Sequence, residues 1–481
     1  MHSISSLHHK LSLLCVLSIL SAAPAVYAAS STAPGAPAMP ASIGAAGKLP
    51  GPGTPLGNQL GVPLGNPPEG LPLGAPPEGL GNQSFNQGSA AATLTKAGVY
   101  RDQKYQSKEQ DQNALRVTGR GVTLEGVRVD KAAGDSTSTE QGDFYGLNAA
   151  VLATDGAHLS VVGGKITSSA KNGNGLFSYG EGTQVLADHV TIRTTGNNSG
   201  GIQTTGGGTT KATGLDLATT GDSSAAIRSD RGGGTVNVTG GRFTTSGYGS
   251  PAIYSTAAIT VTKAKLQAKN SEGAVIEGMN QIHLKDCELE GNMPDVRVMG
   301  PNTIREENVH TVMIYQSMSG DAEEGTSDFA MTGGRLISHR GDVIYVTNTS
   351  CHIDLSGVEI ENHGDGALLR IVGNSGKRGW GKAGSNGGQA TVTATNTNQK
   401  LKGDMVVDSI SHLDLTLNPG TEYKGAIILQ ENNQGSTQES GIDVTIAKGA
   451  VWKLTGDSTV SSLDNQGRID TNGHKLTVLD D

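Results

Sequence analysis

Residues 227–243 read IRSDRGGGTVNVTGGRF, and this stretch carries the pattern that decides the fold. Val236 and Val238 alternate with polar residues, as in a β-strand that buries one of its faces. A Gly-Gly pair then precedes Phe243, which lies five positions after Val238. The phrase is therefore apolar–x–apolar–x4–apolar, which indicates a short strand, a glycine corner and a second short strand.

The same phrase recurs along the chain from about residue 115 onwards. Its middle position advances by about 22 to 26 residues per repeat from Val161, a step typical of solenoid proteins. The step from Leu124 to Val161 is longer and contains an insertion. The aligned phrases are Val122-x-Leu124-x4-Val129, Leu159-x-Val161-x4-Ile166, Val185-x-Ala187-x4-Ile192, Thr210-x-Ala212-x4-Leu217, Val236-x-Val238-x4-Phe243, Ile259-x-Val261-x4-Leu266, Ile282-x-Leu284-x4-Leu289, a degenerate Val309-x4-Ile314, Phe329-x-Met331-x4-Leu336 and Ile353-x-Leu355-x4-Ile360.

A second apolar station keeps the same step, so each repeat contains at least three apolar stations. Its positions are Val151, Leu176, Ile202, Ile227, Ile253, Val275 and Val298. Leucine-rich repeats would require a Leu-x-x-Leu-x-Leu phrase, and helical repeats would require a 3.6-residue period; the chain has neither. The repeats therefore predict an all-β, three-sided parallel β-helix whose coils stack about 4.8 Å apart around a shared core.

Two finer features of the repeat predict local structure. Gly163-Gly164, Gly240-Gly241 and Gly333-Gly334 occupy the same place in three repeats, where we expect the chain to turn a corner that a side chain would obstruct. The residues two places after the third apolar station should also face inward and form an internal stack of hydroxyl groups. These residues are Ser168, Thr194, Thr219 and Thr245.

Phrases such as SGGIQTTGGGTT, SDRGGGTVNVTGGRFTTSGYGSPAIYS and DFAMTGGRLISH resemble those of secreted bacterial right-handed parallel β-helix repeat proteins. These proteins are pectate-lyase-like in fold and often adhesin-like. The resemblance covers roughly residues 115–481 and implies a right-handed solenoid. It does not choose among lyases, hydrolases, adhesins and inert spacers, because the same fold supports all of them.

Composition limits the class of partner. The chain has 481 residues, 70 of them glycine, and a formal net charge of −9, without a run of Lys or Arg. Nucleic acid is therefore not an expected partner, because phosphate binding requires clustered cations. The aromatic content of 4% excludes a thick aromatic core but is compatible with a narrow one of stacked aliphatic layers.

The segments before the repeats predict export and a spacer. Residues 1–28 have an apolar stretch followed by Val26-Tyr27-Ala28, the features of a secretory signal peptide. Residues 29–95 are rich in Pro, Gly and Ala, with PLGNPPEGL repeated as PLGAPPEGL, and indicate a disordered, semi-flexible spacer. The β-helix is expected to occupy residues 96–481. We expect no transmembrane segment in the mature chain and a secreted, extracellular or cell-surface location.

Two cysteines follow the signal segment, Cys287 and Cys351. The aligned repeats place them three coils apart, which corresponds to a backbone separation of roughly 14 Å. A disulfide requires Cα atoms within about 7 Å. We therefore expect two free thiols.

Catalytic chemistry has weak sequence support, although the fold resemblance invites it. Asp295 and Arg297 form a compact carboxylate–arginine pair near an expected coil face, and they are the candidate catalytic residues if the chain is a polysaccharide lyase or glycoside hydrolase. Calcium-binding repeats would place Asp in a Gly-Gly-x-Gly-x-Asp phrase, which does not occur here. We expect no cofactor and no metal, and a non-enzymatic role.

Residues 374–389, NSGKRGWGKAGSNGGQ, interrupt the repeat and suggest a protruding loop. Lys377, Arg378 and Lys382 surround Trp380, one of only two tryptophans. An aromatic ring with flanking cations can stack on a sugar and hold an acidic group, so these four residues are the candidate ligand-binding residues. The alternative is that Trp380 folds back and packs against the solenoid as a plug.

One further motif is Arg340-Gly341-Asp342, an integrin-type tripeptide that chance can also supply in a glycine-rich chain. Together, these features favour a secreted or surface-exposed, adhesin-like scaffold. The expected partner is an extracellular glycan, or a host or envelope protein. The alternative function is cleavage of a polysaccharide.

Overall fold

Residues 227–243 form the two short strands that their pattern predicts. The computed structural model describes residues 85–299, 302–306, 308–375, 386–396, 398–433 and 440–479, all within a compact unit that spans Asn58–Asp481. Val236 and Val238 lie in β19 and Phe243 lies in β20, on either side of the Gly240-Gly241 corner. All three side chains are buried.

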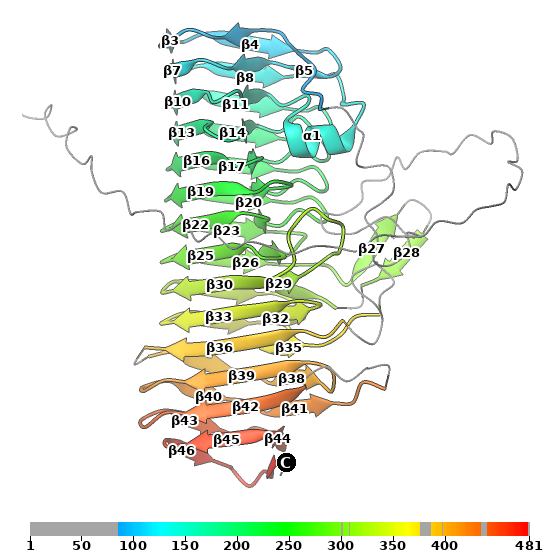
Figure 1. Ribbon diagram of the computed structural model, residues 1–481, viewed down its shortest axis with the longest axis vertical. Coiled ribbons are helices and arrows are strands. Elements are labelled where there is room, and N and C mark those ends of the chain that lie inside the picture. Colours follow the sequence, from blue (N-terminus) through cyan, green and yellow to red (C-terminus); the bar gives the residue numbers. More distant parts are fainter. Residues whose placement is uncertain are drawn as a thin grey trace, which may run out of the picture. The chain divides into compact units, whose positions relative to one another are not determined.

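Three long sheets of parallel strands wrap the described chain into a parallel β-helix, with one strand of each sheet in a typical coil (Figure 1). We name them sheet 1, sheet 2 and sheet 3 in the order in which the chain visits them. Among the described residues, sheet 1 has 14 strands. In spatial order they are β3 (Gly98–Arg101), β7 (Arg120–Glu125), β10 (His158–Val162), β13 (Gln184–Asp188), β16 (Gly208–Thr213), β19 (Gly234–Thr239), β22 (Ala258–Thr262), β25 (Gln281–Lys285), β30 (Thr326–Thr332), β33 (Ser350–Ser356), β36 (Gln389–Thr395), β39 (His412–Leu417), β42 (Gly441–Ile446) and β45 (Ser462–Asn465).

Sheet 2 has 10 strands in the described ranges, and a separate sheet of 4 follows it in sequence. The strands of sheet 2 are β4 (Lys104–Ser107), β8 (Arg128–Lys131), β11 (Lys165–Ser168), β14 (Thr191–Thr194), β17 (Asp216–Thr219), β20 (Arg242–Thr245), β23 (Lys265–Ala268), β26 (Glu288–Gly291), β31 (Arg335–Ser338) and β34 (Glu359–Asn362). The four-stranded sheet consists of β37 (Lys400–Lys402), β40 (Glu422–Lys424), β43 (Val451–Lys453) and β46 (Arg468–Asp470).

Sheet 3 has 13 strands in the part of the chain that the structure describes. They are β2 (Thr93–Leu94), β6 (Leu115–Val117), β9 (Val151–Ala153), β12 (Leu176–Tyr179), β15 (Ile202–Thr205), β18 (Ile227–Ser229), β21 (Ile253–Ser255), β24 (Ala274–Glu277), β29 (His310–Tyr315), β32 (Asp342–Thr347), β35 (Leu369–Ile371), β38 (Met405–Asp408) and β41 (Ile427–Gln430). Two parallel pairs complete the described strands of the coils: β1 (Ser89–Ala90) with β5 (Gln112–Asn113), and β44 (Ser458–Val460) with β47 (Leu476–Val478).

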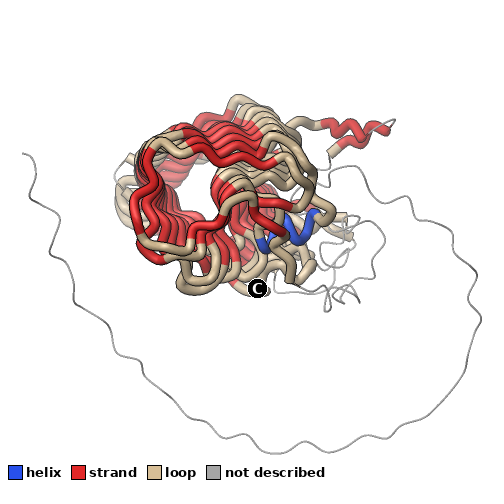
Figure 2. Tube along the Cα trace, turned by 90° about the horizontal axis from the view of Figure 1, so that it is seen from above, coloured by secondary structure: helices blue, strands red, loops and turns tan. Residues whose placement is uncertain are grey.

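Two elements lie outside the stacked coils (Figure 2). One is the helix α1 (Thr139–Tyr145), which falls within the insertion expected after Leu124. The other is an antiparallel hairpin of β27 (Val296–Met299) and β28 (Asn302–Arg305). The hairpin strands pair with each other, so the hairpin adds nothing to the ladders of the three sheets.

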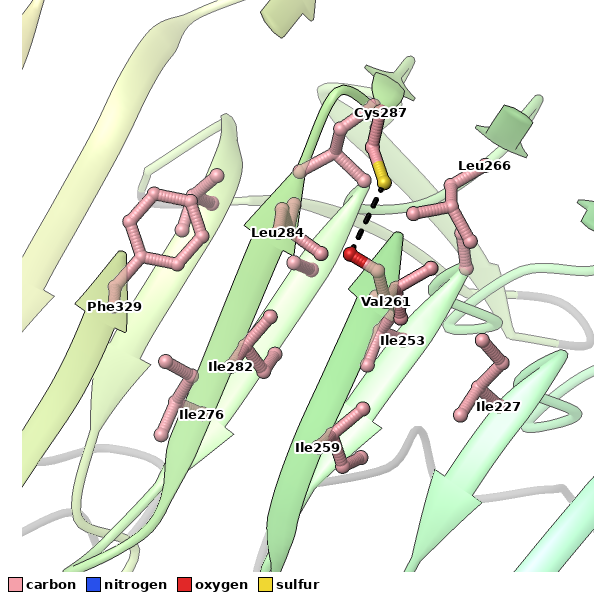
Figure 3. Packing of buried hydrophobic residues seen from close by; sticks show 14 of the residues in the cluster. Ile227, Ile253, Ile259, Val261, Leu266, Ile276, Ile282, Leu284, Cys287 and Phe329 are labelled. Atoms are coloured by element: carbon pink, nitrogen blue, oxygen red, sulfur yellow. Dashed lines mark hydrogen bonds between the residues drawn. The ribbon is translucent and has the colours of Figure 1, made fainter. Parts of the chain in front are cut away.

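The predicted stations stack in register through the core. Val238 pairs with Ala212 on one side and with Val261 on the other. The third stations align in the same way, with Phe243 between Leu217 and Leu266. Figure 3 shows side chains from successive coils meeting in one continuous interior, as expected when the coils share a core.

The predicted corners and hydroxyl stack are both confirmed. A Cβ atom on Gly334 would lie 2.0 Å from the carbonyl oxygen of Cys287, and the glycine has φ +78°. The corner therefore excludes a side chain for reasons of both space and backbone conformation. Thr194, Thr219 and Thr245 align in register with Ser168, are buried, and donate their hydroxyls to backbone carbonyls, for example from Thr194 to Ser199 at 2.5 Å.

The degenerate repeat around Val309 and Ile314 is not a coil of its own. Leu284 pairs directly with Met331, and Ile314 belongs to sheet 3, where it pairs with Ile276 and Val346. One long coil, enlarged by the hairpin, therefore replaces two expected coils. The expectation failed because the hairpin lengthens this coil, which brings Ile314 of sheet 3 to the spacing of the repeat.

The prediction of the second apolar station was wrong at its last two positions, Val275 and Val298. Ala274, not Val275, pairs with Ile253, so Val275 lies on the outer face of sheet 3. Val298 lies in the hairpin.

Strand pairing also begins at Ser89, before the expected boundary at residue 96, so part of the range expected for the spacer belongs to the first coil. Residues 1–84 lie outside the described residues.

The two cysteines are free and buried, as predicted, although their separation in coils changes. Leu284 pairs with Met331 and Met331 with Leu355, so Cys287 and Cys351 lie on coils two steps apart instead of three. Two steps of about 4.8 Å still exceed the reach of a disulfide. The Cys287 thiol contacts the Val261 carbonyl oxygen at 3.3 Å (Figure 3).

Candidate functional site

The large insertions of this solenoid flank sheet 3. Both α1 and the hairpin lie in connections from sheet 2 to sheet 3, and residues 316–325 connect sheet 3 to sheet 1. The corner from sheet 1 to sheet 2 is short by comparison, as between Glu125 and Arg128. Insertions in a repeat protein gather on the face that binds its partner, so the outer face of sheet 3 is the candidate functional face.

Local capping defines α1. The Ser138 side chain accepts a hydrogen bond from the Gln141 amide, and Gly146 ends the helix in the left-handed conformation with φ +81°. Gln203 and Thr205 on sheet 3 donate side-chain hydrogen bonds to the Asp143 and Phe144 carbonyls at 2.5 and 2.6 Å. Because these carbonyls lie at the C-terminal end of the helix and have no helical partner, sheet 3 supplies the bonds that dock α1.

Arg228 connects α1 to sheet 3 through a buried ion cluster with Asp143 and Asp230. Its guanidinium lies 3.0 Å from an Asp143 oxygen and 2.7 Å from an Asp230 oxygen, and its side chain is 1% exposed. Burial raises the pKa of both carboxyl groups, to about 8 for Asp230, against the opposing effect of Arg228. One cation between two buried carboxylates cannot fully compensate both, so the cluster favours retention of one proton.

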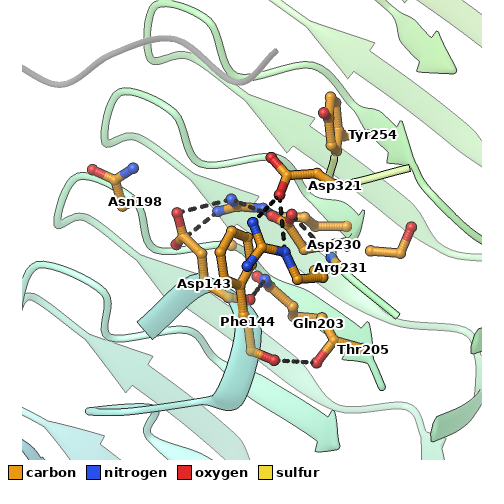
Figure 4. Close-up of polar contacts among 12 residues, drawn as sticks. Asp143, Phe144, Asn198, Gln203, Thr205, Asp230, Arg231, Tyr254 and Asp321 are labelled. Carbon is orange, nitrogen blue, oxygen red and sulfur yellow. Dashed lines mark hydrogen bonds and ion pairs between the residues drawn. The ribbon is translucent and has the colours of Figure 1, made fainter. Parts of the chain in front are cut away.

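Arg231 joins α1 to residues 316–325. Its guanidinium carbon lies 4.3 Å from the centroid of the Phe144 ring, and its Nη2 atom lies 2.6 Å from an Asp321 oxygen. Both members of this ion pair are partly exposed, in contrast to Arg228. Figure 4 shows Arg231 and Asp321 beside Phe144 of the helix.

Glu277 is a second buried carboxylate on this face, held by hydroxyl groups. It accepts hydrogen bonds from Tyr254, Ser317 and Tyr315, the last at 3.0 Å. Burial raises the pKa of Glu277. Ser317 and its neighbour Ser319, which bonds to Asp321 at 3.0 Å, belong to the same insertion, so this network fastens the insertion to the sheet.

The burial of this network favours a structural role over a catalytic one. Glu277 is 1% exposed and Asp230 is 4% exposed, so neither carboxylate can contact a polymer in this conformation. A buried polar network that joins several elements instead holds one arrangement of those elements. We therefore assign these groups to the support of the insertions, and look for ligand contacts at their exposed edge.

The structure moves the candidate catalytic pair off the coil face. Asp295 precedes β27 and contacts the exposed Arg305 and Arg340 at 3.6 and 3.8 Å, while Arg297 lies within β27 opposite Ile304. The pair therefore belongs to the hairpin and its start instead of a strand of the three sheets, and its catalytic role stays a prediction.

The four candidate ligand-binding residues, Lys377, Arg378, Trp380 and Lys382, lie outside the described residues. The flanking residues that are described, up to Ser375 and from Asn386, connect β35 of sheet 3 to β36 of sheet 1. The described ends of this connection therefore lie between sheet 3 and sheet 1, as residues 316–325 do. The question of a binding loop or a plug stays open for Trp380.

The integrin-type tripeptide does not present its carboxylate. Asp342 is 4% exposed and pairs with Arg370 at 2.5 Å, whereas Arg340 is exposed. A receptor that chelates the Asp carboxylate could not reach it in this conformation.

Sequence reasoning missed a surface cluster of aromatic rings beside α1. Phe85, Tyr145 and Tyr179 meet with ring centroids 5.3 to 5.6 Å apart. Phe85 is 55% exposed and the two tyrosines are partly exposed. No spacing in the sequence relates the three residues, so only the docked helix reveals the cluster.

In comparisons with known proteins, no family model, no curated protein and no solved structure matches this chain. Within the described ranges, no group of three or more His, Cys, Asp or Glu side chains could hold a metal ion. The helix in those ranges is also too short and too polar to cross a membrane.

Proposed function

We propose that this protein is a secreted or cell-surface β-helix scaffold of the adhesin-like, pectate-lyase-like kind, which binds an extracellular glycan or else a host or envelope protein. The observation that carries the proposal is that the large insertions in the described residues, α1, the hairpin and residues 316–325, lie at the two edges of sheet 3. Repetitive coils supply a rigid support, and the insertions supply the non-repetitive side chains that recognition requires.

The export signal expected in residues 1–28 and the acidic net charge support an extracellular role without nucleic acid. The buried network around Arg228 and Glu277 supports binding over catalysis, because it immobilises the insertions and withholds its own acidic groups from contact. Rigid loops on a rigid scaffold lose little conformational entropy on binding.

A glycan array probed with the mature chain tests the proposal, and binding of a glycan by the folded chain supports it. A variant in which a short Gly-Ser link replaces residues 296–305 then shows whether the hairpin takes part in that binding. A mature chain that binds neither the arrayed glycans nor intact cells or envelope preparations would contradict it.

The alternative is a polysaccharide lyase or glycoside hydrolase on the same face. Its candidate catalytic residues are Asp295 and Arg297, the compact carboxylate–arginine pair of the sequence. Release of reducing ends or unsaturated products from pectin or host glycans, abolished by Asp295→Asn, would establish it. Binding without product release would exclude it for those substrates.

A further inference from the structure

The apolar core of the solenoid is partly exposed at both of its described ends. In the middle of the solenoid each coil has a neighbour on either side, and Val236, Val238 and Phe243 are at most 2% exposed. In the first and last described coils, the apolar residues that pack against the same core are only partly buried, and Val478 is 42% exposed. These partly buried residues are Ala92, Leu94, Tyr100 and Tyr105 in the first coil, and Leu463, Ile469 and Leu476 in the last. Terminal repeats normally need a polar outer face for solubility, so apolar end layers point to a partner that covers them.

The strand edges at these two ends lack ladder partners within the described ranges. At one end β3, β4 and β2 are the last strands of sheets 1, 2 and 3, and at the other end β45 and β46 close sheet 1 and the four-stranded sheet (Figure 1). In a parallel ladder each strand pairs one edge with the preceding coil and the other edge with the following coil. The first coil therefore lacks a preceding partner and the last coil lacks a following one. These two edges are the complementary halves of one ladder, so a second copy of the chain can continue the ladder head to tail.

The register of sheet 1 shows that the two ends also match in shape. Gly98 lies in the column of Val122, and this column continues from coil to coil as far as Leu463. In a stack that keeps this register, Leu463 of one copy lies on Gly98 of the next, where no side chain occupies the column. Two residues further along each strand, the large ring of Tyr100 lies on the smaller Asn465. A large side chain therefore meets a small one at both positions.

The strands at the two ends carry opposite charge. β3 and β4 contain Arg101 and Lys104 and no acidic residue, and both side chains are exposed. β45 and β46 contain Asp464 and Asp470 against one cation, Arg468. Charged residues on edge strands oppose pairing between edges of like charge. Here they repel when two like ends meet and attract when unlike ends meet, so they favour the head-to-tail arrangement.

We propose that this chain assembles with copies of itself head to tail, with the last coil of one copy stacked on the first coil of the next. The contact joins two different surfaces and adds each copy along the solenoid axis, so its product is an open filament one solenoid wide. Such a filament presents the outer face of sheet 3 many times, and repeated sites bind a surface with higher avidity than a single site does. The inference rests on the coil ends and goes beyond the proposed scaffold function.

Sedimentation velocity of the mature chain over a range of concentrations, together with negative-stain electron microscopy, tests the proposal. We expect particles that lengthen with concentration and keep the width of one solenoid. Two charge-reversal chains test the contact: Asp464→Lys with Asp470→Lys makes both ends positive, and Arg101→Glu with Lys104→Glu makes both ends negative. Each chain alone should need a concentration about tenfold or more higher to assemble. An equimolar mixture of the two should assemble again, because every positive end then has a negative end to meet.

Matched variants separate the contact from general effects of charge and of folding. Lys211→Glu with Lys285→Glu reverses two exposed charges on sheet 1 away from the ends, and this chain should assemble as the wild type does. Val478→Asn, at an exposed apolar residue of the last coil, should weaken assembly without a change in the circular dichroism spectrum.

Four outcomes would overturn the inference. The first is a chain that stays monomeric at every concentration, as expected if residues 1–84 of the same chain cover an end. The second is bundles wider than one solenoid, and the third is a charge-reversal chain that assembles as readily as the wild type. The fourth is a mixture of the two folded charge-reversal chains that does not assemble. None of these outcomes changes the result of the glycan array, so the scaffold function is tested separately.

Discussion

At the scale of single residues, successive side chains in a strand point alternately into the core and out of the coil. Val238 is 2% exposed between Ala212 and Val261, whereas the adjacent Asn237 lies on the outer face of sheet 1. Neighbouring residues in one strand therefore have opposite tolerance to charge.

Val238→Asp should destabilise the fold by several kcal/mol, because it places a carboxylate among aliphatic neighbours without a partner. Asn237→Asp should change stability by no more than about 0.5 kcal/mol, because its side chain meets solvent and lies opposite Lys211. Thermal or urea unfolding of the two variants measures the difference. Equal midpoints would contradict the strand assignment.

The buried carboxyl group of Asp230 predicts a pH dependence of stability. Its pKa in the folded chain is about 8, above its value of about 3.9 in an unfolded chain. Between these values the folded state holds a proton that the unfolded state has released, so this contribution is full at low pH and is lost as the pH rises through 8. The unfolding free energy of the wild type should therefore fall more steeply from pH 5 to 8 than that of Asp230→Asn, whose amide oxygen can still accept from Arg228. Parallel curves would refute the assignment.

At the scale of elements, insertions are docked by side chains that the coils do not need for their own pairing. Arg228 is the clearest case, because its backbone pairs within sheet 3 while its side chain forms an ion pair with Asp143 of α1. The hairpin is the opposite case, since its strands pair only with each other.

Arg228→Met should cost about 3–5 kcal/mol at pH 7, because it leaves the buried carboxyl groups of Asp143 and Asp230 without the cation that compensates their charge. Addition of Asp143→Asn and Asp230→Asn should restore part of this loss. Arg193→Met, which removes an exposed ion pair with Asp216, is the control and should cost no more than about 1 kcal/mol. Urea unfolding gives the three values, and similar losses for Arg228→Met and Arg193→Met would show that the cluster is not a support.

Replacement of residues 296–305 by a short Gly-Ser link should leave the β-type circular dichroism spectrum unchanged. The hairpin contributes no strand to the three sheets, and loop closure entropy changes by only about 0.6 kcal/mol per doubling of loop length. Removal of β26, a strand of sheet 2, is the control and should abolish cooperative unfolding. A link variant that fails to fold would mean that the coil depends on the hairpin.

At the scale of the whole molecule, the register of the coils determines which distant residues can meet. Cys287 and Cys351 are brought onto coils two steps apart, and the side chains of both are buried. Burial raises the pKa of both thiols, most strongly that of Cys351. The thiolate, which is the reactive form, is therefore scarce in the folded chain.

Both thiols should resist alkylation in the native protein and react once the chain is denatured without reducing agent. Mass spectrometry after each treatment reports the two sites separately. Recovery of a tryptic peptide pair joined through Cys287 and Cys351 would contradict the register, because two coil steps exceed the reach of a disulfide.

The sequence by itself determined the coil, the apolar stations other than Val275 and Val298, the corner glycines and the internal hydroxyl stack. Each of these features is a local pattern. Strand alternation and corner conformation depend on a few consecutive residues, and the same pattern recurs in successive repeats. The count of coils failed only where an insertion imitated the spacing, and the pairing of Ile314 with Ile276 resolved it.

Only the tertiary structure decided the candidate site. Asp143, Arg228 and Asp321 come from segments far apart in the chain, and so do Phe85, Tyr145 and Tyr179. No period relates these residues, because their neighbours are set by how α1 and residues 316–325 dock across several coils. Charge pairing, burial and hydrogen bonding among side chains decide that docking, and these interactions exist only once the coils have stacked.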